Sequence, residues 1–169
     1  MNKLQYNTGL RFTIISLLCL QGFFSLAQAI VVDASGKGNF KTIQAAINSL
    51  SDRATTPRTI IIKNGTYSEQ VFISKNNIIL KGESREKTII TQAIARDIFR
   101  CSTQDDWGVA TLNLKGNDIS LLNLTIQNTY GFDNLKETTI ACPNDTITHE
   151  KKVRKDGHQM ALRSFKQPG

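Results

Sequence analysis

Short apolar segments separated by turns dominate the middle of this 169-residue chain. The segments are Thr59–Ile62, Val71–Ile73, Ile78–Leu80, Thr88–Thr91, Leu112–Leu114 and Ile119–Ile126. In the last of these the apolar phase slips near Leu121 and Leu122, which predicts a corner or bulge. Segments this short and rich in β-branched residues predict an all-β fold: a sandwich, a barrel or a coil-by-coil solenoid.

Weak hairpin signals favour the solenoid. The best hairpin signal is Asn64-Gly65, and it lacks clean alternation on both sides. Two runs echo each other instead, Ile79-Leu80-Lys81-Gly82 and Asn113-Leu114-Lys115-Gly116. Such echoes favour stacked parallel rungs, which bury their inner residues against one another.

One helix is predicted, because Ile43, Ala46, Ile47 and Leu50 follow helical spacing. Asn39 or Thr42 would cap its start. We expect this helix to cover the open apolar end of the first rung. From Thr129 to Arg154 no period is sustained, which predicts a long surface loop.

The N-terminus, residues 1–29, has the form of a signal peptide. Lys3 and Arg11 precede an uncharged stretch, Phe12–Leu26, and Ala27-Gln28-Ala29 has the small-x-small pattern of a cleavage site. The stretch is shorter than the roughly 20 residues that cross a bilayer. We therefore expect a secreted protein, extracellular or periplasmic, with one domain over 30–169 and no stable membrane insertion after cleavage.

The net charge does not identify the class of molecule that the protein binds. Without Lys3 and Arg11 the chain has 19 basic and 14 acidic residues, a net charge of +5. That excess suits an acidic polysaccharide as readily as nucleic acid, and a merely solvated surface equally well. Aromatic residues are absent from the basic run Lys151 to Lys155, so we do not expect a nucleic-acid partner.

Two cysteines, Cys101 and Cys142, remain after cleavage. Export permits a disulfide between them, which would close a loop of about 40 residues and stabilise the fold by roughly 3–4 kcal/mol. Two free thiols are the equal alternative. Neither histidine joins a cluster with metal-ligand spacing, so we expect no metal and no other cofactor.

Three runs, in order, match the motifs of one enzyme family. Gly36 to Gln44 matches the G-x-G-x-F-x-T-I-Q core of that family's opening, and Gly65 to Glu69 its G-x-Y-x-E signature. His158 to Arg163 is similar to its Q-A-V-A-L-R segment, with Met160 replacing Ala and Ala161 replacing Val. Ala110-Thr111 and Ile126 to Thr129 lie between them in the family's order. In these runs the chain resembles the pectin methylesterases, or pectinesterases.

The resemblance implies an incomplete right-handed parallel β-helix with a short N-terminal capping helix. It also implies metal-free hydrolysis of galacturonate methyl esters in pectin. In such chemistry one aspartate attacks the ester carbonyl and a second gives the leaving methanol a proton, while glutamine amides stabilise the oxyanion. An arginine orients the nucleophile.

Gln159 matches the first oxyanion glutamine of the family. Asp106 falls near a family threonine that touches substrate, whereas Tyr67 and Glu69 are interpreted as structural. The second glutamine, both aspartates and the arginine follow this segment in the family, so we expect residues 1–169 alone to be inactive. Asp105-Asp106 would be a poor substitute pair, since loop acids are usually solvated.

Two other classes of protein remain open at this point. One is another secreted β-helical pectic enzyme, a lyase or a polygalacturonase. The other is a non-catalytic carbohydrate-binding solenoid.

Overall fold

The structure, a computed structural model, describes residues 29–133, 136–154 and 157–165. Apart from Ala29, the predicted signal peptide lies outside these residues. The elements in chain order are β1 (Ile30–Val32), α2 (Ile43–Ser49), β2 (Arg58–Ile62), β3 (Gly65–Ser68), β4 (Val71–Ile73), β5 (Ile78–Gly82), β6 (Thr88–Gln92), α3 (Arg96–Ser102), β7 (Ala110–Leu114), β8 (Ile119–Leu122), β9 (Thr125–Asn128), α4 (Tyr130–Asp133), β10 (Thr138–Ala141), β11 (Glu150–Val153) and β12 (Met160–Ser164).

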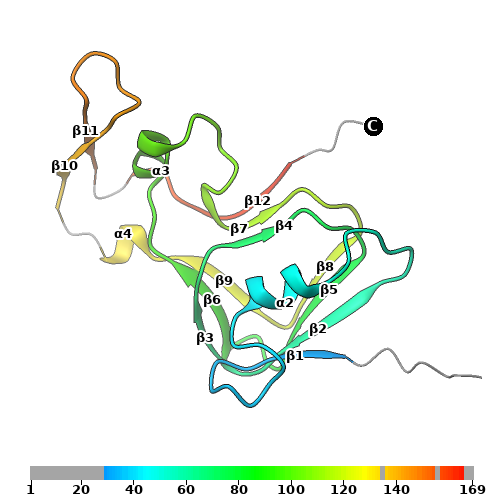
Figure 1. Ribbon diagram of the computed structural model, residues 1–169. Coiled ribbons are helices and arrows are strands. Elements are labelled where there is room, and N and C mark those ends of the chain that lie inside the picture. Colours follow the sequence, from blue (N-terminus) through cyan, green and yellow to red (C-terminus); the bar gives the residue numbers. More distant parts are fainter. Residues whose placement is uncertain (1–28, 134–135, 155–156, 166–169) are drawn as a thin grey trace, which may run out of the picture.

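Ten of the strands build a solenoid from three parallel sheets. The sheets have the orders β1-β2-β5-β8, β3-β6-β9 and β4-β7-β12, so each coil of chain gives one strand to each sheet. β2, β3 and β4 make the first such coil, and the strands of the following coils stack on them (Figure 1). This arrangement is a parallel β-helix, and the solenoid prediction is confirmed.

The core lies inside the coils and is built from columns of stacked apolar residues. In the first sheet Ile60 pairs with Leu80 and Leu80 with Leu121, at one level of the stack. Ile60 and Leu80 are completely buried, whereas Leu121 in the outer coil is half-buried. Parallel strands bury their inner residues against the next coil, which explains why the inner positions of short segments are so consistently apolar.

Helix α2 covers the first coil, as predicted. The Thr42 side chain caps the helix by accepting a hydrogen bond from Ala45 N at 3.2 Å, and Ile43, Ala46 and Ile47 are buried. Gln44 closes the free edge of β4, because its Oε1 accepts from Phe72 N at 2.7 Å and its Nε2 donates to Phe72 O. The edge of β4 that no other described strand pairs with is therefore covered by hydrogen bonds from α2.

Glu69 ties the same helix to the start of β4. Its two carboxylate oxygens accept hydrogen bonds from Ile43 N at 2.8 Å and Gln44 N at 3.0 Å. A carboxylate at this position satisfies free N–H groups of the first helical turn and complements the helix dipole. The motif positions Thr42, Gln44 and Glu69 thus have a shared structural role.

The predicted corner near Leu121 and Leu122 is present one residue later. β8 ends at Leu122, and Asn123 adopts a left-handed backbone conformation, φ 51°, before β9 begins at Thr125. The turn also passes close to the coil below, since a Cβ at Gly82 would lie 2.0 Å from Asn123 O. This contact explains the glycine at the end of the first echo, Ile79 to Gly82.

Two excursions leave the solenoid at the same corner of successive coils. One connects β6 to β7 and contains α3, and the other connects β9 to β12 and contains α4 and β10–β11. They share a small apolar cluster of Ala95, Tyr130 and Val153, with Ile98 and Ile140 packed against it. Figure 1 shows the excursions together beyond the edges of the second and third sheets.

The prediction of one long surface loop over Thr129–Arg154 was wrong. Thr138–Ala141 and Glu150–Val153 form an antiparallel hairpin, and α4 precedes it. Most side chains of both strands are exposed, with Val153 the buried exception, so no alternating apolar pattern marks them. Among the described residues, no helix is long and apolar enough to span a bilayer.

Candidate functional site

The outer face of the β4-β7-β12 sheet and the two excursions carry the predicted site residues. Gln159 lies immediately before β12, in the connection that returns from the hairpin. Its half-buried side chain shares the outward parity of Ala161 and Arg163, since Leu162 pairs with the core residue Leu112. The strand thus directs the Gln159 amide away from the core.

The Gln159 amide is held by one specific hydrogen bond. Gly131 N donates to Gln159 Oε1 at 2.9 Å. An N–H group can only donate, so this contact fixes which end of the amide is the oxygen. Nε2 is left as the donor, and within the described part of the chain it makes no hydrogen bond that would occupy it.

Gly131 approaches this amide too closely for a larger residue. A Cβ at position 131 would lie 2.5 Å from Gln159 Nε2. The connection that carries Gln159 is also fixed on its other side, where Arg96 N donates to His158 O at 2.7 Å. Residues of both excursions therefore orient the candidate oxyanion donor, while the His158 side chain is exposed to solvent.

Asp106 lies at the centre of an arginine cluster. Its carboxylate accepts from Arg96 Nε at 3.1 Å and Nη2 at 3.2 Å, and it pairs with Arg163 Nη1 at 3.0 Å. Arg100 Nη1 is more distant, at 3.8 Å. The hydrogen bonds from Arg96 are the main cause that lowers the pKa of Asp106, and the charges of all three arginines add to it.

The arginine cluster occupies the carboxylate of Asp106. The carboxylate is ionised and occupied by its partners, and it links α3 to the outward face of β12 through Arg96 and Arg163. Three guanidinium groups around one carboxylate leave an excess of positive charge at the surface. Asp105 does not pair with Asp106, because its Oδ1 accepts from Trp107 N at 2.8 Å and its side chain is exposed.

An aromatic group lies on the same sheet face. Trp107 packs edge-on against Phe72 and Phe165, with ring centroids 5.3 Å apart in both pairs. Lys115 Nζ lies 4.4 Å from the Trp107 ring centroid, and the Arg163 guanidinium 4.8 Å from that of Phe165. Aromatic rings flanked by cations suit a ligand with apolar and anionic parts.

Asn113 holds the loop that carries Asp106 and Trp107. This fully buried side chain accepts from Gly108 N and Ala110 N at 3.2 Å and donates to Ala110 O at 2.7 Å. Gly108 has a φ of 106° and lies against Phe72 and Phe99, where a Cβ would come within 3.0 Å of both rings. Both features keep the loop in one conformation.

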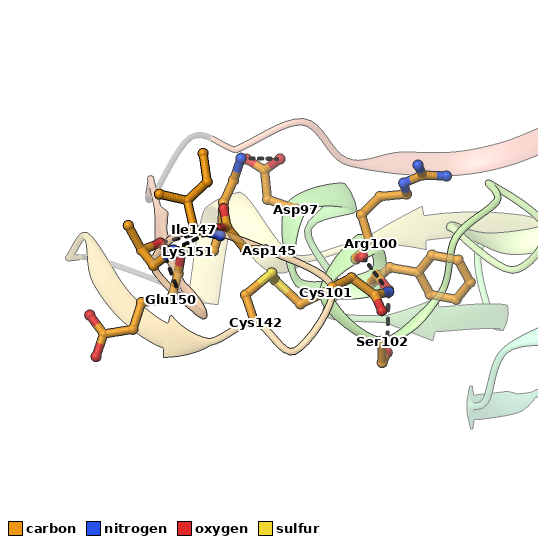
Figure 2. Close-up of a disulfide and its surroundings, with 12 residues drawn as sticks. Asp97, Arg100, Cys101, Ser102, Cys142, Asp145, Ile147, Glu150 and Lys151 are labelled. Carbon is orange, nitrogen blue, oxygen red and sulfur yellow. Dashed lines mark hydrogen bonds and ion pairs between the residues drawn. A yellow bond between two sulfur atoms is a disulfide. The ribbon is translucent and has the colours of Figure 1, made fainter.

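The two cysteines lie on different excursions and are bonded. Cys101 at the end of α3 and Cys142 beside the hairpin form a disulfide with an S–S distance of 2.08 Å and a Cα–Cα distance of 4.4 Å (Figure 2). The bond attaches the hairpin to α3. Sequence reasoning left this pairing open, because the two positions approach only once both excursions have folded at one corner.

Several members of the site were not predicted from sequence. Gly131 and Arg96 gave no signal, since their roles depend on contacts with Gln159 and Asp106 across 28 and 10 residues of chain. Asn128 is a further example, a buried amide that binds Ile94 N, Ile94 O and Met160 O where the excursions begin and end. Its only sequence signal was its place in the run Ile126 to Thr129.

The chain is similar in sequence to pectinesterases. The Pectinesterase family model matches residues 29–167. Pectinesterase A of Dickeya chrysanthemi is 41% identical over 108 residues, which cover 62% of this chain and 29% of that protein. Pectinesterase of Aspergillus niger is 36% identical over 108 residues, covering 61% of this chain and 32% of that protein.

Solved structures show the same similarity. A pectin methylesterase from Erwinia chrysanthemi superposes with a TM-score of 0.60 at 32% identity, over 81% of this chain and 38% of that one. Pectin methylesterase from carrot superposes with a TM-score of 0.58 at 28% identity, over 82% and 36%. The chain therefore spans roughly a third of the length of the relatives it matches.

Proposed function

The chain belongs to the pectinesterase family, and from this we propose that the intact protein hydrolyses galacturonate methyl esters in pectin. The family match favours this reaction over those of a lyase or a polygalacturonase. It likewise favours an enzyme over a non-catalytic carbohydrate-binding solenoid. Pectin is the proposed substrate, and no step of the proposed chemistry needs a metal or an organic cofactor.

The observation that carries the proposal is the anchored amide of Gln159. Gly131 N occupies its Oε1, so Nε2 is the end offered to a ligand. When a nucleophile adds to an ester carbonyl, negative charge develops on the carbonyl oxygen. An amide N–H that is already oriented toward that oxygen stabilises the transition state without reorganising, which is worth about 3–4 kcal/mol in comparable sites.

The other described groups have supporting roles in this proposal. Asp106 acts through Arg96 and Arg163, which it holds beside the sheet face, so it is a positioning residue. The cluster's excess positive charge attracts the carboxylates of partly de-esterified pectin. Asp105 and Asp106 do not form a catalytic pair, because Asp105 bonds to Trp107 N and Asp106 bonds to Arg96. We therefore assign the carboxylate that attacks the ester and the one that protonates the leaving methanol to other residues of the intact protein.

The test is methanol release from methylated pectin by the intact protein and by Gln159→Ala. We expect kcat to fall roughly 100- to 1000-fold, with KM changed much less. Gln92→Ala is a matched control, because Gln92 lies on the second sheet and its side-chain amide has no hydrogen-bond partner among the described residues. If Gln159→Ala releases methanol at the rate of the control, the role assigned to Gln159 is refuted. Chain cleavage without methanol release would refute the esterase assignment.

Export remains part of the same proposal. The first strand begins at Ile30, directly after the expected cleavage site, so removal of residues 1–29 would leave the described fold whole. N-terminal sequencing of protein collected outside the cytoplasm should begin at Ile30. A mature protein that retains Met1 or Lys3 would refute cleavage.

A further inference from the structure

A pocket of about 550 Å³ lies between α3 and the loop that joins β10 to β11. Its charged lining includes Arg96, Asp97 and Arg100 from the helix and Asp145 and Lys151 from the second excursion. We propose that this pocket is an accessory binding site for the carboxylate of a de-esterified uronic acid unit. The identity of the sugar rests on the proposed function, whereas the preference for a carboxylate rests on the pocket itself.

The walls of the pocket are covalently and locally fixed. The disulfide Cys101–Cys142 joins the end of α3 to the opposite wall. Next to it, Asn144 Nδ2 donates to Arg100 O at 3.2 Å, and Asn144 N donates to Cys101 O at 3.3 Å. A ligand would therefore meet a cavity that exists before binding, which lowers the entropic cost of ordering it.

Two cations of the pocket, Lys151 and Arg100, are held only weakly by neighbouring acids. Lys151 Nζ lies 4.0 Å from Asp97 Oδ1, and Arg100 Nη1 lies 3.8 Å from Asp106 Oδ1, both too long for a hydrogen bond. Figure 2 shows Lys151 reaching toward Asp97 from the hairpin, while the Arg100 side chain extends from α3 away from this pair. A ligand carboxylate would gain charge-assisted hydrogen bonds that these acids do not make.

The remaining acid, Asp145, is already occupied within its own turn. Its Oδ1 accepts from Ile147 N and Thr148 N, each at 2.9 Å, so its charge is stabilised by the backbone. Arg96 uses Nε and Nη2 on Asp106, and within the described residues its Nη1 has no hydrogen-bond partner. Arg96, Arg100 and Lys151 thus line a cavity in which Asp145 accepts hydrogen bonds from the backbone and Asp97 is loosely paired.

The pocket lies next to the proposed reaction site. Arg96 lines it, and Arg96 N donates to the backbone oxygen of His158, the residue before Gln159. Both excursions contribute to the pocket and to the anchoring of Gln159. A polysaccharide chain bound at Gln159 would therefore pass this corner, and a unit that has lost its methyl group would present a carboxylate there.

The chemistry predicts selectivity between two forms of one sugar. A carboxylate accepts hydrogen bonds from guanidinium and ammonium groups with full charge, whereas its methyl ester is neutral. Losing one charge-assisted contact costs roughly a factor of ten in affinity. The pocket should thus retain de-esterified units and ignore esterified ones.

The experiment measures binding of two probes by calorimetry at fixed salt, a fully de-esterified galacturonate hexamer and its fully methyl-esterified form. All titrations use the intact protein with Gln159→Ala, because its roughly 100- to 1000-fold lower kcat preserves the esterified probe during the measurement. The intact protein should bind the de-esterified hexamer more tightly. Arg100→Gln and Lys151→Gln should each weaken that binding about 10-fold and leave the esterified form unchanged. The side chains are 38% and 45% exposed and weakly paired, so both variants should keep the wild-type melting temperature.

Lys81→Gln is the matched control, since it removes one exposed cation from the outward face of the first sheet. It should change the affinity less than twofold. Equal losses in Arg100→Gln and Lys81→Gln would overturn the proposal in favour of non-specific charge attraction, as would equal binding of both hexamers. Gln159→Ala separates the two proposals: it should lower kcat for methanol release roughly 100- to 1000-fold and keep the Arg100-dependent binding. Normal turnover with binding indifferent to Arg100 and Lys151 would refute the pocket alone.

Discussion

Replacing Gly131 by alanine tests whether the orientation of Gln159 matters, without touching Gln159 itself. The added methyl would lie 2.5 Å from Gln159 Nε2. Non-bonded heavy atoms normally keep about 3.5–4.0 Å apart, so one group must move by roughly 1 Å. The end of the flexible glutamine side chain will move, because Gly131 belongs to the backbone of α4.

The effect on stability should be small. Displacing Gln159 removes its hydrogen bond from Gly131 N, which contributes about 0.5–1.5 kcal/mol. Alanine restricts the unfolded chain more than glycine does, which restores about 0.4–1 kcal/mol. Because the two effects oppose each other, we expect the free energy of unfolding to change by less than about 1 kcal/mol.

The effect on catalysis should be large. A displaced Nε2 no longer points at the developing oxyanion, and loss of such a donor costs roughly 100- to 1000-fold in kcat. The assay is methanol release by the intact protein, with melting temperatures measured in parallel. The double variant Gly131→Ala/Gln159→Ala should be no slower than Gln159→Ala alone, since both changes remove the same interaction.

Gly157→Ala is the control for a glycine at the same corner. The three atoms nearest to a Cβ there belong to Arg154, Ala95 and Tyr130, with Arg154 O at 3.1 Å, and none belongs to Gln159. We expect this variant to keep kcat within about twofold. If Gly131→Ala also keeps wild-type kcat while Gln159→Ala loses it, the orienting role of Gly131 is wrong. If the Gly131 and Gln159 effects simply add, the two residues act independently.

Three further predictions concern stability. Cys101→Ser should lower the free energy of unfolding by about 4 kcal/mol, because the bond with Cys142 closes a loop of 41 residues and so restricts the unfolded chain. In urea unfolding, a reductant should destabilise the wild type by the same amount and leave the variant unchanged. Glu69→Ala should destabilise α2 by about 1–2 kcal/mol, seen as a lower melting temperature, because two N–H groups of the first turn lose their acceptor; an unchanged melting temperature would contradict this. The folded state lowers the pKa of Asp106 below its ordinary 3.8, so the ionised carboxylate stabilises the fold fully above about pH 4, and this stabilisation is lost as the pH falls through the lowered pKa. In urea titrations, the free energies of unfolding of the wild type and Asp106→Asn should therefore converge as the solution is acidified below about pH 4. A difference that stays constant with pH would refute this linkage.

Short apolar segments in the sequence were sufficient to predict the strands of the solenoid. Val71–Ile73 was predicted with its observed bounds, and Ile78–Leu80 and Thr88–Thr91 were short by one or two residues. Apart from the buried Thr88, the residues of these segments that point into the core are apolar, because each coil buries the same positions against the next. The capping helix was equally readable, since Ile43, Ala46 and Ile47 show one apolar face.

Other elements had no such signal. α3 buries only Cys101 from its seven residues, and the hairpin strands are mostly exposed, so periodicity does not mark them. β3 begins at Gly65, which was interpreted as a turn residue. These segments form because the coil below or the other excursion supplies their partners.

The amino-acid sequence was enough to predict the stacked strands, the helix that covers the first coil and the membership in the pectinesterase family. These follow from residues close together in the chain, where burial imposes a repeating pattern. Three features became apparent only in the folded chain: Gly131 anchors Gln159, three arginines surround Asp106, and Cys101 bonds to Cys142. The disulfide joins the two excursions, and the contact of Asp106 with Arg163 joins the first excursion to β12. These distances are fixed only when successive coils stack in register and bring both excursions to one corner. Arg96 and Arg100 reach Asp106 within the first excursion, and Gly131 reaches Gln159 within the second, once each excursion has folded back on itself.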